Sequence, residues 1–186
     1  QDPALGPARL LGLVNRVLVD AIRQLGEDKY MTITALRRAP DGSVRFAGAH
    51  QDLHVLRAGR AEVETIESSG VWLGIVADIE HTLVERELRL AEGDVLVLHT
   101  DGITEAAGAG ERFDERGLRA VLERASGSSA GEIVSKVFDS LAAYELRDDA
   151  TVLVLRQLEP PVRFHGPANG APSSDRTDAA ASRRAT

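Results

Sequence analysis

The 186-residue sequence contains no cysteine. This excludes a disulfide scaffold, a thiolate zinc site and a cysteine nucleophile, and it fits the reducing environment of the cytoplasm, where we expect the protein to act. Basic charge is also scarce: 22 Lys and Arg face 29 Asp and Glu, so the net charge of −7 argues against nucleic acid as a partner. No apolar run approaches the roughly 20 residues that span a bilayer, and no signal peptide is visible. We therefore expect no membrane segment.

The composition otherwise suits a folded domain. Hydrophobic residues make up 43% of the chain and charged residues 27%, which are ordinary values for a globular protein. From Pro160 onward, Pro, Ala, Ser, Arg and Gly dominate and large apolar residues almost disappear. We therefore expect a single folded unit over residues 1–158 and a disordered tail over 159–186.

The order of the predicted elements indicates the fold class. Apolar residues recur at helical spacing over residues 7–25, and Gly26 ends that helix. Ser129 and Glu132 have the spacing of a capping box, which predicts the start of another helix. The predicted strands are 30–36, 44–49, 53–57, 63–66, 83–90, 95–100 and 150–155, and a further helix is predicted over 117–125. One helix, many strands, two helices and one strand make an α+β fold with mainly antiparallel sheets, because alternating βαβ units are missing.

Acidic residues lie at the ends of two predicted strands. Asp101 directly follows the strand in "VLVLHTDG", whereas Asp148 and Asp149 directly precede the last strand. If these strands are antiparallel neighbours, the acids converge at one sheet edge and repel each other unless a proton or a cation lies between them. Carboxylate oxygens suit Mg²⁺ or Mn²⁺, and Gly102 lets the chain turn away without a side chain crowding the ion. The alternative is that the acids only form turns or caps, since Asp-Gly is a common turn signal.

Two motifs at this spacing resemble a known family. "GDVLVLHTDGITEA" and, after two predicted helices, "RDDATVLVLR" are similar to the SpoIIE/RsbU-like branch of the metal-dependent protein serine/threonine phosphatases (the PPM, type 2C-like family). The upstream stretches "LLGLVNRVL" and "SGVWLGI" agree, so the resemblance covers about residues 8–157. It implies a β-sandwich flanked by helices, with a dinuclear Mg²⁺ or Mn²⁺ site at one edge. A metal-activated water would attack a phosphoserine or phosphothreonine ester.

The resemblance also assigns roles to individual residues. Asp101 and Asp148 match two metal-ligand aspartates of the family. Gly102 and Asp149 are candidates for positioning those ligands without binding the metal themselves. Glu105 belongs to the motif without an expected metal role. The implied partner is a phosphorylated protein of the anti-sigma-factor antagonist type, and a sensor domain is often attached in this branch.

The chain departs from the family pattern at its beginning. An early Asp-Gly whose acid bridges the two ions, and a following Asp-x-x-Gly-His-Gly, are both missing, and the only other Asp-Gly, Asp41-Gly42, falls in a predicted hairpin turn. We therefore expect residues 1–158 to be the C-terminal portion of a phosphatase domain. The full-length protein would be a hydrolase, whereas the chain alone would bind metal weakly and show little or no phosphatase activity.

Two other functions compete with this interpretation. The chain could be a non-catalytic regulatory or binding module that keeps the fold without a working metal centre. It could also be a haloacid-dehalogenase-type phosphotransferase, because "HTDGIT" echoes Asp-x-Asp-Gly-Thr. The second alternative fails because its nucleophilic aspartate is replaced by His99 and because the strand-rich order argues against that α/β fold.

Three histidines require a separate assessment. His50 and His54 have the i, i+4 spacing of a helical zinc pair, but their segment is predicted to be a strand and its entry, and no third ligand is evident nearby. The sequence favours solvated or hydrogen-bonded loop histidines at both positions. His99, on the strand before Asp101, could support a metal ligand, but the sequence favours an aromatic or polar filler at this position.

Overall fold

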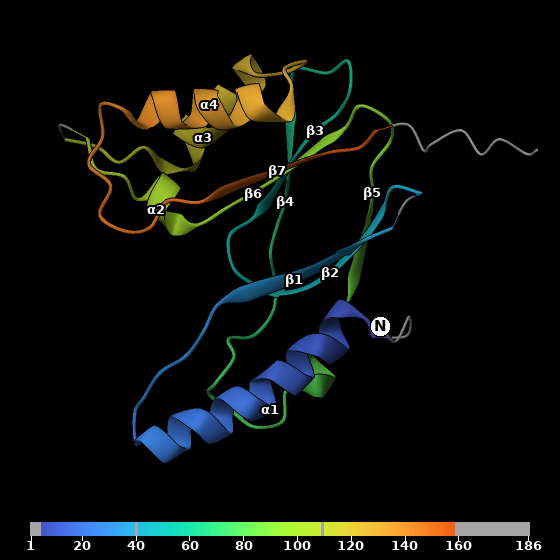
Figure 1. Ribbon diagram of the computed structural model, residues 1–186, viewed down its shortest axis with the longest axis vertical. Coiled ribbons are helices and arrows are strands. Elements are labelled where there is room, and N and C mark those ends of the chain that lie inside the picture. Colours follow the sequence, from blue (N-terminus) through green and yellow to red (C-terminus); the bar gives the residue numbers. More distant parts are fainter. Residues whose placement is uncertain (1–4, 40, 109, 159–186) are drawn as a thin grey trace, which may run out of the picture.

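The computed structural model describes residues 5–39, 41–108 and 110–158, and the predicted tail over 159–186 lies outside them. Its elements stack in four layers: two helices, a four-stranded sheet, a three-stranded sheet and the N-terminal helix (Figure 1). The helices are α1 (Pro7–Leu25), α2 (Asp101–Thr104), α3 (Asp114–Arg124) and α4 (Ala130–Leu141), with a 3₁₀ turn at Glu80–Thr82. The strands are β1 (Ile33–Arg38), β2 (Ser43–Ala49), β3 (Leu53–Leu56), β4 (Val63–Ile66), β5 (Arg86–Arg89), β6 (Val95–His99) and β7 (Val152–Arg156). The predicted α+β sandwich is confirmed.

All strand pairs of the two sheets are antiparallel. The smaller sheet has the order β1-β2-β5 and the larger one β4-β3-β6-β7. In the larger sheet β6 lies between β3 and β7, with Val97 opposite His54 and His99 opposite Val152. Strand β7, the last element of the described residues, therefore pairs with the strand that ends in the T-D-G turn.

Three apolar cores separate the four layers. The core between the larger sheet and α3 and α4 includes Val95 and Val97, whereas Leu96 belongs to the core between the sheets. This is the alternation expected of a strand, in which successive side chains point to opposite faces. A third core, which includes Leu11 and Ile79, lies between the smaller sheet and α1. Strand β6 is thus covered on both faces.

The ends of two helices follow from local chemistry. Gly26 has φ of 66° and ends α1 in the left-handed conformation that glycine adopts without steric cost. The predicted capping box of α4 is present: the Ser129 hydroxyl accepts a hydrogen bond from the Glu132 backbone N–H, and the Glu132 carboxylate accepts one from the Ser129 N–H at 2.7 Å.

Some boundaries differ from the prediction. Strand β1 begins at Ile33 rather than residue 30, because Tyr30 leaves the sheet and stacks on Trp72 with ring centroids 4.7 Å apart. Helix α3 begins at Asp114 rather than residue 117. The Asp114 carboxylate accepts hydrogen bonds from the backbone N–H groups of Arg116 and Gly117, which caps the first turn earlier than the apolar pattern indicates.

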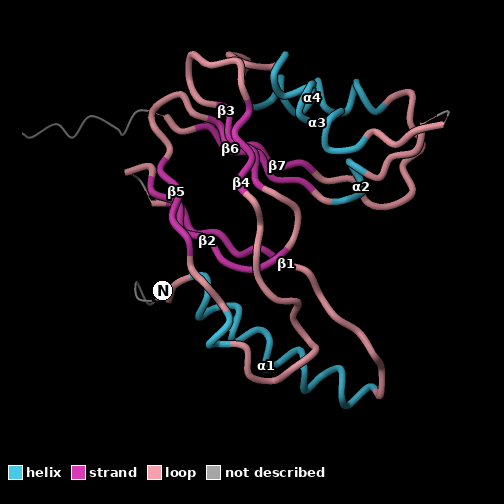
Figure 2. The backbone as a smooth tube through the Cα atoms, turned by 180° about the vertical axis from the view of Figure 1, so that it is seen from behind, coloured by secondary structure: helices cyan, strands magenta, loops and turns pink. Residues whose placement is uncertain are grey.

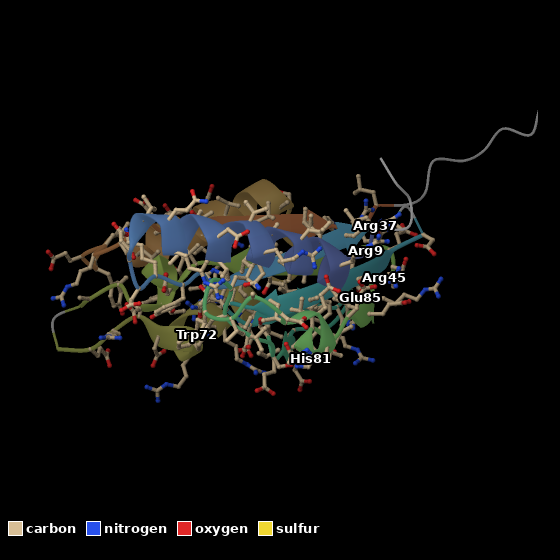
Figure 3. All side chains as sticks on the ribbon, turned by 90° about the horizontal axis from the view of Figure 1, so that it is seen from below. Arg9, Arg37, Arg45, Trp72, His81 and Glu85 are labelled. Atoms are coloured by element: carbon tan, nitrogen blue, oxygen red, sulfur yellow. The ribbon has the colours of Figure 1, made fainter. Side chains whose placement is uncertain are left out.

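Glu85 connects α1 to the smaller sheet. Its carboxylate pairs with Arg45 of β2 and accepts a hydrogen bond from the Ala8 backbone N–H of α1. Arg45 and Glu85 lie close to each other in the view from the α1 side (Figure 3).

Among residues 5–39, 41–108 and 110–158, no helix combines the length and the hydrophobicity of a membrane span.

Asp94 anchors the turn that leads into β6. It is buried, and its carboxylate accepts hydrogen bonds at 2.9 Å from the backbone N–H groups of Ala58 and Ala91 and from the Arg57 guanidinium. Burial alone would raise the pKa of Asp94, but these donors outweigh it and hold the pKa below its ordinary value of 3.8. A lowered pKa means that the charged form stabilises the fold above pH 3.8 and that this contribution is lost as the pH falls further.

We predict that Asp94→Asn lowers the free energy of unfolding at neutral pH by about 1–3 kcal/mol, since the charge-assisted hydrogen bonds are lost. The difference in free energy of unfolding between the variant and the wild type should become smaller below pH 3.8, where the carboxyl of the wild type also takes up a proton. Urea denaturation at neutral and acidic pH measures both values, with exposed Asp139→Asn as the control. An equal loss at both pH values would show that the charge of Asp94 is not what stabilises the turn.

Candidate functional site

The acidic motifs lie at the end of the β6–β7 pair. The two strands are antiparallel neighbours, as the sequence analysis supposed, and His99 at the end of β6 faces Val152 at the start of β7. Asp101 begins α2, one residue after the end of β6, while Asp148 and Asp149 lie in the segment that enters β7. Both segments occupy the same end of the larger sheet, beside α2 (Figure 2).

Thr100 joins the two segments. Its backbone N–H donates to the Thr151 carbonyl at 3.0 Å. Its hydroxyl donates to the Asp149 carbonyl at 2.9 Å and accepts from the Thr151 N–H at 2.9 Å. Thr100 was not among the predicted site residues, although a hydroxyl residue between a strand and an acid could have indicated it.

Gly102 permits a close approach of the two backbones. A Cβ at this position would lie 2.5 Å from the Asp149 carbonyl oxygen and 2.8 Å from its carbon, which no side chain tolerates. The structure therefore gives a reason for glycine that the sequence did not indicate: the missing side chain makes room for the Asp149 backbone.

The carboxylates of Asp101, Asp148 and Asp149 are exposed. Asp148 accepts a hydrogen bond from the Asp149 backbone N–H at 2.7 Å. Glu105, from the motif of Asp101, pairs with Arg112 at 3.2 Å. Within residues 5–39, 41–108 and 110–158, neither Asp101 nor Asp148 belongs to a group of three converging ligand side chains. The sharing of one ion by these two acids stays a prediction.

A different group of ligand side chains converges between the larger sheet and α3. His54 of β3, His99 of β6 and Glu115 of α3 bring their ligand atoms within 4.8 Å of one another. The Glu115 carboxylate lies 3.2 Å from His54 Nε2 and 3.5 Å from His99 Nε2. The two imidazoles stack with centroids 5.3 Å apart.

This arrangement corrects the interpretation of His54 as a loop residue. His54 lies on β3, where only 2% of it is exposed, whereas His50 lies outside the strands and contacts the Thr32 hydroxyl at 3.0 Å. The sequence did not reveal the third ligand because α3 is distant in the chain and reaches the sheet only through packing. The periodicity of β6 does place His99 on the face of Val97, which is a usable signal.

The pKa values in this cluster follow from burial and from charge. Burial lowers the pKa of His99 and outweighs the Glu115 carboxylate and the Thr100 carbonyl, which favour the protonated ring. Contact with His54 lowers the pKa of Glu115, and His99 adds to this effect against the opposing effect of burial. The cluster therefore combines a neutral His99 with an ionised Glu115 at neutral pH.

The comparisons with known proteins agree with the fold. The family model described as Stage II sporulation protein E (SpoIIE) matches residues 2–158. The phosphoserine phosphatase RsbU of Bacillus subtilis (strain 168) is 34% identical over 95 residues, a match covering 50% of this chain and 28% of RsbU.

Solved structures with the same architecture extend this result. The SiaA-PP2C domain of Pseudomonas aeruginosa superposes with a TM-score of 0.68 at 25% identity, over 81% of this chain and 61% of that one. The RsbU and RsbW domains of Rv1364c from Mycobacterium tuberculosis give a TM-score of 0.61 at 19% identity, over 76% and 40% of the two chains, which shows the fold alone. This chain therefore spans less than two thirds of these relatives. With the family model covering most of its length, the chain belongs to the SpoIIE family.

Proposed function

We propose that this chain carries part of the metal centre of a protein-serine/threonine phosphatase that hydrolyses phosphoserine or phosphothreonine esters in bacterial signalling. The observation that carries the proposal is the junction at Thr100, which holds the T-D-G and D-D-x-T motifs together at one sheet edge. The relative with 34% identity is named a phosphoserine phosphatase, which supports the same reaction.

Asp101 and Asp148 are the proposed metal ligands. Their oxygen donors suit Mn²⁺ or Mg²⁺, and their exposure leaves room for water and a phosphoryl group. Gly102 supports the arrangement because its missing side chain lets the backbone of Asp149 approach. A bound ion would lower the pKa of a coordinated water and neutralise charge on the phosphoryl oxygens.

The described residues offer these two acids no third carboxylate. Hard divalent cations are held by several oxygen ligands, so two exposed acids give a weak site. We therefore propose that the chain by itself binds Mn²⁺ weakly and turns over substrate slowly, and that the complete enzyme supplies the remaining ligands.

The proposed substrate is a phosphorylated protein of the anti-sigma-factor antagonist type, in the cytoplasm, with a sensor domain attached in the complete protein. Support comes from the RsbU relative and from a structural neighbour in which RsbU and RsbW domains occur together. A phosphate ester is negatively charged, so the exposed acids repel it unless bound cations neutralise their charge. Metal binding and substrate binding should therefore depend on each other.

We expect Asp101→Asn and Asp148→Asn each to weaken Mn²⁺ binding at least about tenfold, the loss typical of disturbed metal sites. Calorimetric titration with Mn²⁺ measures this, and Asp139→Asn, which removes an exposed acid on α4, is the matched control. Equal affinities in all four proteins would show that the two acids share no ion.

A turnover assay with a phosphoserine protein and Mn²⁺ tests the reaction. The wild-type chain should be slower than a complete domain of the family, and both aspartate variants should be slower still. Turnover equal to a complete domain would contradict the proposed incompleteness. Turnover absent even when the complete protein is assayed would instead support a non-catalytic module.

Thr100→Val should weaken Mn²⁺ binding and lower the free energy of unfolding by about 0.5–1.5 kcal/mol, because the exposed hydrogen bonds of the hydroxyl to the Asp149 carbonyl and from the Thr151 N–H are lost. Thr100→Ser keeps the hydroxyl and should restore both properties. Mn²⁺ titration and urea denaturation of the two variants measure the effect. A serine variant as impaired as the valine variant would show that the methyl group, rather than the hydrogen bonds, positions the acids.

A further inference from the structure

We propose that His54, His99 and Glu115 form a second metal site that binds Zn²⁺ or a similar transition-metal ion in preference to Mg²⁺ and Mn²⁺. This site is separate from the one proposed at Asp101 and Asp148, and it uses different donor atoms. The proposal is independent of the phosphatase activity.

The positions of the three side chains are set by different layers. His54 and His99 come from the paired strands β3 and β6, and both lie on the sheet face that α3 covers. Glu115 comes from the first turn of α3 and is half exposed, with 47% of its side chain accessible. The site therefore has buried walls and one side open to solvent.

The hydrogen bonds of the two rings leave their Nε2 atoms free. His99 Nδ1 lies 3.2 Å from the Thr100 carbonyl, which only accepts, so the proton of a neutral His99 is on Nδ1 and Nε2 keeps its lone pair. His54 Nδ1 contacts the Thr65 hydroxyl at 3.3 Å. Both Nε2 atoms are buried without a hydrogen-bond partner.

The lone pair of His99 Nε2 therefore faces the Glu115 carboxylate, and His54 Nε2 offers a second lone pair there when its Nδ1 proton is donated to the Thr65 hydroxyl. An acceptor nitrogen and carboxylate oxygens within 3.5 Å repel each other unless a cation lies between them. A metal ion satisfies all three groups at once, and an outer hydrogen bond from the other ring nitrogen is the usual device that orients a ligating histidine.

The donor set indicates which ion fits. Two imidazole nitrogens and one carboxylate are a known three-ligand zinc set, with a fourth position left for water. Tetrahedral bonds of about 2.0–2.2 Å separate neighbouring ligand atoms by about 3.3–3.6 Å. His54 Nε2 lies 3.2 Å from Glu115 Oε2, and His99 Nε2 lies 3.5 Å from Glu115 Oε1, so the spacing of the three side chains is close to this range. Nitrogen donors favour Zn²⁺, Ni²⁺ and Cu²⁺ over Mg²⁺ and Mn²⁺.

An ion at this position would connect β3, β6 and α3. His99 is separated from Asp101 only by Thr100, whose carbonyl and hydroxyl contact the His99 ring and the Asp149 carbonyl. The bound ion would therefore fix the end of β6 and the turn that carries Asp101.

Zinc binding to untagged protein tests the proposal, by competition with a chromogenic chelator at neutral pH. We expect one tight equivalent in the wild type, at least a tenfold weaker Kd in Glu115→Gln, and loss of tight binding in His54→Phe. Because Glu115 is half exposed, its glutamine variant should fold, and circular dichroism checks this. Co²⁺ in place of Zn²⁺ should give the visible absorption of a tetrahedral nitrogen and oxygen site in the wild type but not in Glu115→Gln or His54→Phe.

Two controls separate this site from other sources of zinc binding. His81→Ala removes an exposed histidine (Figure 3) and should leave the zinc Kd unchanged, as should Asp101→Asn. The proposal is overturned if the wild type binds no zinc, if Glu115→Gln and His54→Phe bind it as the wild type does, or if Asp101→Asn alone loses it. Failure of the phosphatase proposal would instead appear as unchanged Mn²⁺ binding in Asp101→Asn.

Discussion

The pairing of β6 between β3 and β7 is the constraint on which both candidate sites depend. Because side chains alternate along a strand, Val95, Val97 and His99 face α3 and α4 while Leu96 faces the smaller sheet. A shift of β6 by one residue would turn His99 away from Glu115 and place an apolar core residue toward the wrong layer. The same register brings the end of β6 beside the start of β7, so that the two acidic motifs become neighbours.

Thr100 lies between two regions with different ligand chemistry. On one side are the exposed carboxylates of Asp101 and Asp148, and on the other is a buried group that includes two imidazoles. The Thr100 carbonyl contacts the His99 ring, while its hydroxyl holds the Asp149 backbone. Thr100 thus links the position of the His99 ring, which lies between the larger sheet and α3, to the position of the Asp149 backbone.

The sequence predicted the parts of this fold that depend on local chemistry. Helix α1 ends at Leu25 as expected because Gly26 adopts a left-handed conformation, and α4 begins after the capping box of Ser129. Helix α3 begins earlier than its apolar pattern because Asp114 caps it. The family was also evident, since its two motifs lie at fixed positions relative to strands.

What the sequence did not reveal depends on contacts between distant segments. His54 resembles a loop histidine until β3 is placed in the centre of a sheet, where burial changes its chemistry. Glu115 has no local motif that links it to either histidine, because the contact arises only when α3 packs on the sheet. The sequence also did not reveal that Gly102 makes room for the backbone of Asp149, which is distant in the chain.

If both metal proposals hold, the two ions are thermodynamically coupled through Thr100. An ion that fixes His99 restricts the turn carrying Asp101, so the factor by which Zn²⁺ changes Mn²⁺ affinity must equal the factor by which Mn²⁺ changes Zn²⁺ affinity. Nitrogen and oxygen donors allow the two ions to be titrated separately, since each prefers a different site. The metal dependence of activity, measured with one ion alone, therefore combines binding at Asp101 and Asp148 with binding at His54, His99 and Glu115. Titrating each ion in the presence and absence of the other separates these two effects.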